Sequence, residues 1–194
     1  MKYISFFLIN IFILNGCKND GTLNYQKLIE TELSKNSRED ELLYGLRFGM
    51  TKEEFYDHCR RMNKNGLFFN SAGNAAVVCR IQDEFKSPVK VSFYPEFIDN
   101  KIYKLPAIIN YEAFAPWNKN LFADSLVADL LQFFNKKFGQ APLLQMTDPN
   151  NKNVFVRVDA NRRITITKKD ERETIIEFTD LLIEKKTSKN AQPF

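Results

Sequence analysis

The spacing of apolar residues along this chain changes several times, and each change marks a predicted element. From residue 55 the apolar positions recur every three or four residues, which is typical of one face of a helix; they are Phe55, Cys59 and Met62. Thr51 precedes Glu54 by three residues, the spacing of a capping box, in which each side chain bonds the backbone amide of the other residue. The sequence therefore predicts a helix from Thr51 to about residue 65.

After Gly66 the apolar period falls to two, which indicates strands. The alternating runs cover 77–82, 89–94, 103–111, 154–158, 164–167 and 175–183. Between the first three and the last three lies a second helical pattern, which follows Trp117 and ends where Gly139 interrupts it. Pro106 falls inside the third run. Because proline has no amide hydrogen to donate, we expect that run to be an edge strand or to carry a bulge.

The order of one helix and then three strands therefore occurs twice, over 51–111 and over 118–183. Strands joined by short loops pair antiparallel, and a helix before each set suits a layer of helices on one face of a sheet. We predict an α+β fold in which an antiparallel sheet is covered by two main helices. The repeat is one of pattern without residue identity between the halves, so it allows two helix-plus-three-strand units without requiring them.

The first seventeen residues carry a separate signal. Lys2 precedes an apolar run at 4–14, which is too short to cross about 30 Å of hydrocarbon, and Leu14-Asn15-Gly16-Cys17 ends it. This pattern resembles the lipobox of bacterial lipoproteins, in which a peptidase cuts before the cysteine. The resemblance implies that Cys17 becomes the first mature residue and carries acyl chains such as palmitate, which anchor the chain to a membrane.

Four parts follow from these patterns. They are a lipoprotein signal peptide at 1–16, the lipidated cysteine and a tether at 17–44, a single α+β domain at 45–184, and a polar tail at 185–194. Within the tether, apolar residues near helical spacing predict a short helix over 23–33. The apolar face of that helix is also able to dock on the body.

Residues 49–55 have the pattern G-M-T-x-x-E-F. This pattern resembles the helix start of small envelope lipoproteins, including the SmpA/OmlA outer-membrane assembly family and Bacteroidetes-type envelope lipoproteins. A chain of two helix-plus-sheet units resembles the same family and the β-lactamase-inhibitor type of fold. The resemblance implies a protein of the bacterial cell envelope, anchored at the outer membrane on its periplasmic face or at the cell surface. Each residue of the segment already serves as turn, staple or cap, so the segment transfers no function.

Composition adds that 44% of the 194 residues are apolar, with 18 phenylalanines, which is enough for one domain with a real core. Apart from Cys17, the chain contains Cys59 and Cys79, and the exported compartment permits disulfides. A disulfide between these two cysteines and a pair of free thiols packed in the core are both compatible with their predicted core-facing positions.

The residues that carry candidate chemistry are few. His58 is the only histidine, which excludes a site of several histidines, and we expect it to flank the core without a metal or cofactor. Basic residues gather around one predicted hairpin, at Arg162, Arg163, Lys168 and Lys169. They form either a solvated strand edge or a contact with anionic headgroups. A nucleic-acid partner is not expected for an exported chain.

Two functional classes remain open. The first is a lipid-anchored binding or scaffold module, whose partners are the membrane and an envelope protein or ligand. The second is an envelope hydrolase or carbohydrate-active enzyme, which needs two carboxylates about 5 to 9.5 Å apart across a cleft. No catalytic residue is singled out by the sequence, which favours the binding module.

Overall fold

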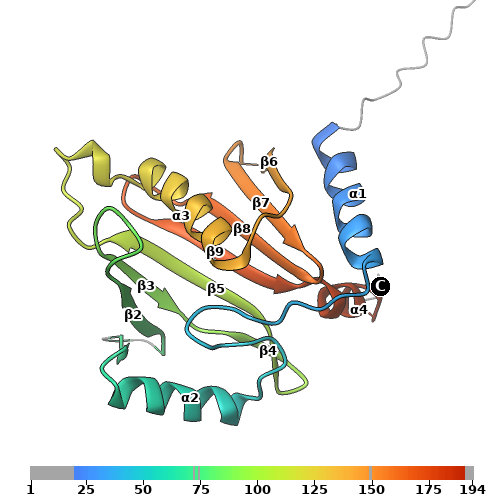
Figure 1. Cartoon of the computed structure of the whole chain (residues 1–194), viewed down its shortest axis with the longest axis horizontal. Coiled ribbons are helices and arrows are strands. Elements are labelled where there is room, and N and C mark those ends of the chain that lie inside the picture. The colour runs from blue at the N-terminus through green and yellow to red at the C-terminus, as the bar shows by residue number, and fades with distance from the viewer. Residues whose placement is uncertain (1–19, 72, 74, 149, 191–194) are drawn as a thin grey trace, which may run out of the picture.

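The computed structural model describes residues 20–71, 73, 75–148 and 150–190 (Figure 1). The helices are α1 Asp20–Ser34, α2 Lys52–Lys64, α3 Ala123–Phe138 and α4 Leu181–Asn190, with the short 3-10 helix η1 Lys119–Leu121 before α3. The strands are β1 Phe68–Asn70, β2 Val77–Ile81, β3 Val89–Phe93, β4 Glu96–Ile98, β5 Lys101–Tyr111, β6 Leu143–Thr147, β7 Asn153–Asp159, β8 Arg162–Lys168 and β9 Thr174–Asp180.

These strands form one open antiparallel sheet in the order β1-β2-β3-β5-β9-β8-β7-β6, with β4 paired beside β5. The strands after α2 and the strands after α3 each form a meander, and the two meanders meet where β5 pairs with β9. The predicted α+β class is therefore confirmed. Each meander has four strands along the main path where three were predicted; the additional strands are β1, which has only three residues, and β6, and both lie at the outer edges of the sheet.

The prediction that Pro106 lies in an edge strand is wrong. It lies in β5, which is central in the sheet, and it pairs with Glu177 of β9. On the other side of β5, β3 ends opposite Ala107 and β4 begins opposite Lys104, so Pro106 has no paired residue there. The β4–β5 register also shifts beside this junction, which agrees with the expected bulge. A missing amide hydrogen costs least at such a gap in the ladder.

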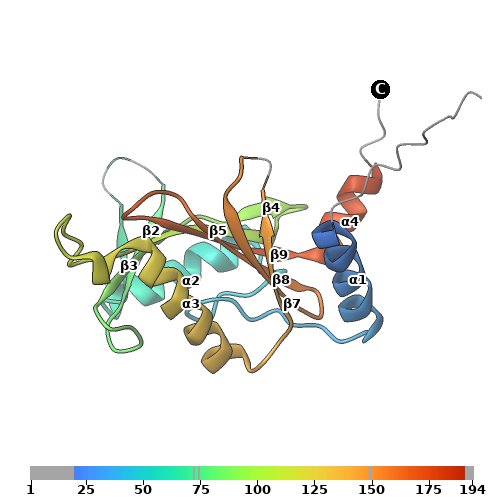
Figure 2. The ribbon, with the colours of Figure 1, turned by 90° about the horizontal axis from the view of Figure 1, so that it is seen from above.

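The capping box predicted at the start of α2 is confirmed. The Glu54 amide donates to Thr51 Oγ1 at 3.2 Å, and the Thr51 amide donates to Glu54 Oε2 at 2.7 Å. α2 and α3 lie on the same side of the sheet, where their apolar faces build the core (Figure 2). Within that core, Phe134 of α3 meets Phe178 of β9 edge-on, with ring centroids 5.6 Å apart. Aromatic contacts of this kind explain the many phenylalanines.

The short helix expected in the tether is present as α1 and is docked on the sheet. On β7, the Arg157 side chain reaches Asn135 of α3, whereas its neighbours Val156 and Val158 point to the opposite face. The residues of α1 that pack there are Tyr25, Leu28, Ile29 and Leu33. α1 therefore covers the far face of the second meander.

The segment that follows α1 is also part of the folded body. Leu42 and Leu43 are buried in the main core. Arg38 pairs with the buried Asp180 at 2.8 Å, which joins this segment to the end of β9. The body therefore begins before the expected boundary at residue 45.

The C-terminal end of the chain differs from the expected division. The expected polar tail at 185–194 is helical as far as α4 extends, to Asn190. The signal peptide expected at 1–16, and Cys17, lie outside the described residues. In both views α4 lies beside α1 (Figures 1 and 2).

Candidate functional site

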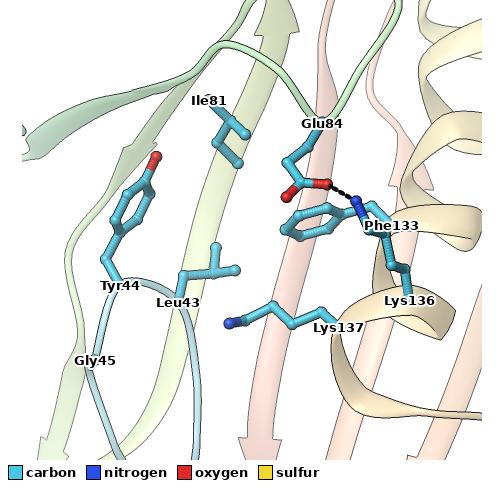
Figure 3. Close-up of a pocket in the computed structure, with 8 residues that line it drawn as sticks. All are labelled: Leu43, Tyr44, Gly45, Ile81, Glu84, Phe133, Lys136 and Lys137. Atoms are coloured by element: carbon cyan, nitrogen blue, oxygen red, sulfur yellow. Dashed lines mark hydrogen bonds and ion pairs between the residues drawn. The ribbon is translucent and has the colours of Figure 1, made fainter.

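A cavity of about 460 Å³ opens between the turn at 43–45 and α3 (Figure 3). Its lining residues are Leu43, Tyr44, Gly45, Ile81, Glu84, Phe133, Lys136 and Lys137. They come from the segment before α2, from β2 and the loop after it, and from the C-terminal half of α3. This size and this largely apolar lining are typical of ligand sites at the junction of two structural units.

His58 holds the turn that forms one wall of the cavity. Its Nε2 donates a hydrogen bond to the Tyr44 carbonyl at 2.8 Å, as the neutral ring allows. Gly45 has φ +76°, which favours glycine, and a Cβ there would lie 3.3 Å from the His58 ring. Burial and the charge of Arg61 lower the pKa of His58 below its usual value. The histidine therefore supports this turn through its hydrogen bond.

Tyr44 forms a second part of the same wall. Its hydroxyl donates to the Arg80 carbonyl at 2.6 Å, and its ring meets Phe68 edge-on. Burial raises the pKa of Tyr44 to about 12, so the hydroxyl stays protonated near neutral pH. The Tyr44 side chain is thus a neutral part of the cavity wall, held in place by its hydrogen bond and its contact with Phe68.

Two ion pairs frame the opening. Lys136 Nζ lies 2.7 Å from Glu84 Oε2 and bridges α3 to the loop after β2 (Figure 3). Lys137 Nζ lies 2.9 Å from Glu41 Oε1. Exposed pairs of this kind add little stability, so either lysine is able to exchange its partner for an anionic group of a ligand.

The floor between these ion pairs is apolar, and Phe133 is its largest side chain (Figure 3). The centroid of its ring lies 5.2 Å from the centroid of the Phe85 ring. Sequence reasoning did not single out any of the eight lining residues, because they carry no shared motif. The one local signal is Phe133 itself, a bulky aromatic residue of α3 that is only partly buried against the core. The arrangement suits a ligand that combines an apolar part with an anionic group.

The two arginines of the predicted basic hairpin do not face solvent. Arg162 is 1% exposed; its Nη1 donates to the Glu41 carbonyl at 2.7 Å, and its guanidinium lies 3.9 Å from the Phe138 ring centroid. Arg163 is mostly buried and pairs with Glu184 at 2.7 Å. The expected headgroup contact does not hold for Arg162 and Arg163, because α3 and α1 cover both faces of this part of the sheet.

Lys168 and Lys169 lie at the other end of β8 and remain on the surface. Lys168 pairs with Asp124 and Lys169 pairs with Glu173, each at 2.6 Å. With Asp170 they line a cavity of about 390 Å³. A hydrogen bond from the Glu173 amide holds the pKa of Asp170 below its usual value. The acid of a carboxylate enzyme needs a raised pKa, so Asp170 does not fit that role.

Cys59 and Cys79 are both free thiols in the structure. Cys59 is half-buried in α2, and Cys79 is fully buried in β2. Burial raises the pKa of Cys59 to about 11 and that of Cys79 to about 12. Of the two alternatives that the sequence left open, the structure has the packed thiols.

Across 20–71, 75–148 and 150–190, no three or more His, Cys, Asp or Glu side chains are grouped so that they can hold a metal ion. None of the helices in the described part of the chain combines the length and the apolar character that crossing a bilayer requires. Comparison of the chain with protein-family models, with curated proteins and with solved structures gives no match. The structure shows an α+β protein in which two meanders form one sheet, with a cavity between α3 and the segment before α2.

Proposed function

We propose that this chain is a lipid-anchored lipoprotein of the bacterial envelope whose α+β body is a binding module. The observation that carries the binding role is the cavity of Figure 3, where an apolar floor adjoins the ammonium groups of Lys136 and Lys137. Phe133 supplies contact area, and the lysines supply charge for an anionic group of the bound protein or small molecule.

The anchoring role rests on the lipobox pattern at 14–17 and on its distance from the body. α1 begins at Asp20, three residues after Cys17. Because α1 docks on β7, a lipid on Cys17 would hold the body itself close to the membrane. Several acyl chains on one cysteine give stable attachment.

Metabolic labelling with a clickable palmitate analogue tests the anchor. We expect the wild-type chain to incorporate the label and to fractionate with membranes, and the Cys17→Ser variant to do neither. Incorporation into Cys17→Ser, or its absence from the wild type, would contradict the anchor.

Site-specific photo-crosslinking in intact cells tests the cavity. A photoreactive residue replaces Lys136 at the rim or, as the matched control, the exposed Lys90 on the other face of the sheet. We expect a discrete, reproducible adduct from position 136 that position 90 does not yield. Identical adducts at both positions, or none at position 136, would argue against this cavity as the binding site.

A further inference from the structure

Three segments that are far apart in the sequence lie along one edge of the molecule. The start of α1, the turn between β6 and β7, and η1 all lie at the top of Figure 1, and Figure 2 views this edge from above. Trp117, two residues before η1, is 86% exposed, the highest value among the large apolar side chains of the described residues. Leu23, in the first turn of α1, is 42% exposed.

The loop that presents Trp117 is firmly held at its base. The ring centroids of Phe114 and Phe122 lie 5.4 Å apart, and the Arg172 guanidinium lies 5.7 Å from the Phe114 ring centroid. The Ala123 amide donates to the Glu171 carbonyl at 2.8 Å, which joins the loop to the turn between β8 and β9. The loop is therefore ordered around an indole that it leaves in water.

The position of the anchor indicates what that contact is. Three residues span at most about 11 Å, so a lipidated Cys17 would lie within that distance of the first residue of α1. The anchor would thus hold the α1 end of this edge near the membrane, and η1 lies at the other end of the same edge (Figure 1). Tryptophan favours the headgroup region of a bilayer, where its ring is half in contact with hydrocarbon and its N–H with water.

We propose that this edge rests on the phospholipid bilayer and that Trp117 inserts into the headgroup region. The proposal rests on the lipid anchor of the proposed function. The lysines at the end of β8, near the loop of Trp117, are already paired with acids: Lys168 with Asp124 and Lys169 with Glu173, each at 2.6 Å. The contact therefore depends on the indole and not on anionic lipid.

Trp117 is the only tryptophan of the chain, so its fluorescence reports on this edge alone. The experiment uses the full lipidated protein in phosphatidylcholine vesicles, with and without lipids brominated near the headgroup. We expect emission at shorter wavelength than in detergent-free buffer, and loss of intensity in the brominated vesicles. The matched control is the double variant Trp117→Phe/Tyr56→Trp, which moves the tryptophan to α2, at the bottom of Figure 1, where Tyr56 is 39% exposed. Its emission should not be quenched.

The outcomes separate this proposal from the anchor. If mass spectrometry shows lipid on Cys17 and Trp117 emission is neither shifted nor quenched, the edge contact is overturned while the anchor stands. Equal quenching of the two tryptophan positions overturns it as well. If Cys17 carries no lipid, the anchor fails, and the unlipidated chain mixed with the same vesicles tests the edge directly: a shift of Trp117 emission supports the contact and an unchanged spectrum rejects it.

Discussion

At the residue scale, Arg162 shows how a charge enters the interior of this protein. Its guanidinium donates to Asp159 Oδ2 at 2.8 Å and to the Glu41 carbonyl at 2.7 Å, and so joins the end of β7 to the segment after α1. Removal of one partner of a buried ionic contact leaves the other groups desolvated and unpaired. The buried guanidinium of Arg162 therefore helps to hold the segment that leads from α1 into the core.

We expect Arg162→Met to lower the free energy of unfolding by about 3 kcal/mol, because the Glu41 carbonyl loses its donor and Asp159 keeps only the longer contact with Arg157, at 3.6 Å. Urea denaturation followed by circular dichroism measures this. The exposed Lys90→Met is the control and should change stability by less than about 0.5 kcal/mol. A loss for Arg162→Met as small as that of the control would contradict the role of the buried pair.

The two thiols make a second prediction. With the pKa of Cys59 at about 11, only about one thiol in a thousand is ionised at pH 8, and fewer at Cys79. We expect both to resist alkylation by iodoacetamide in the folded protein and both to react after unfolding without reductant. Mass spectrometry counts the added groups. If alkylation after unfolding requires a reductant, the cysteines are paired and the free-thiol assignment fails.

The lowered pKa of His58 makes stability depend on pH. Burial and Arg61 hold this pKa below its ordinary 6.5, so the unfolded chain binds a proton at a higher pH than the folded chain. The free energy of unfolding should therefore fall as pH decreases below about 6.5. We expect His58→Gln, which keeps a donor toward the Tyr44 carbonyl, to flatten this part of the profile in urea denaturation. An unchanged slope would assign the effect to other groups.

At the element scale, α1 is attached to the body mainly by one apolar face. Its residues surround Val156 and Val158, in a small cluster separate from the main core. The buried Glu32 adds a hydrogen bond from the Ala160 amide at 3.2 Å. An element held by so few contacts opens more readily than the central strands.

We expect Ile29→Ala to weaken the docking of α1 by about 1 kcal/mol. Ile29 is half-buried, so its truncation removes about half of the apolar contact that a fully buried isoleucine would make. Hydrogen exchange should become faster in α1 and stay unchanged in β3 and β5. The exposed Gln26→Ala on the same helix is the control. Unchanged exchange in α1 for the Ile29 variant would show that this face does not hold the helix.

At the scale of the whole molecule, the two meanders share one core. The main apolar cluster contains residues of both, from Phe55 in α2 to Phe178 in β9, and the β5–β9 ladder makes the sheet continuous between them. The chain should therefore unfold as a single cooperative unit although its sequence pattern repeats.

Phe178 lies at this junction, fully buried beside Phe134 and Phe138. We expect Phe178→Ala to lower the free energy of unfolding by about 3 to 5 kcal/mol. Hydrogen exchange should then accelerate equally in β2–β5 and in β6–β9. Faster exchange in β6–β9 alone would show two independently stable units.

The sequence by itself determined the features that depend on neighbouring residues. The capping box of Thr51 and Glu54, the amphipathic faces of α2 and α3, and the six longer strands follow from local spacing, which acts wherever the chain folds. The α+β class followed from the order of these elements. The pattern at 14–17, which resembles a lipobox and is likewise local, predicts the anchor.

Only the tertiary structure decided which of these elements meet. Pro106 became central because β9 pairs beside β5; Arg162 became buried because the segment after α1 crosses it; and the cavity formed because three distant segments converge on Phe133. Each depends on contacts between residues far apart in the chain. Local period and propensity carry no information on such contacts, because the free energy that selects them comes from burial shared among several elements at once.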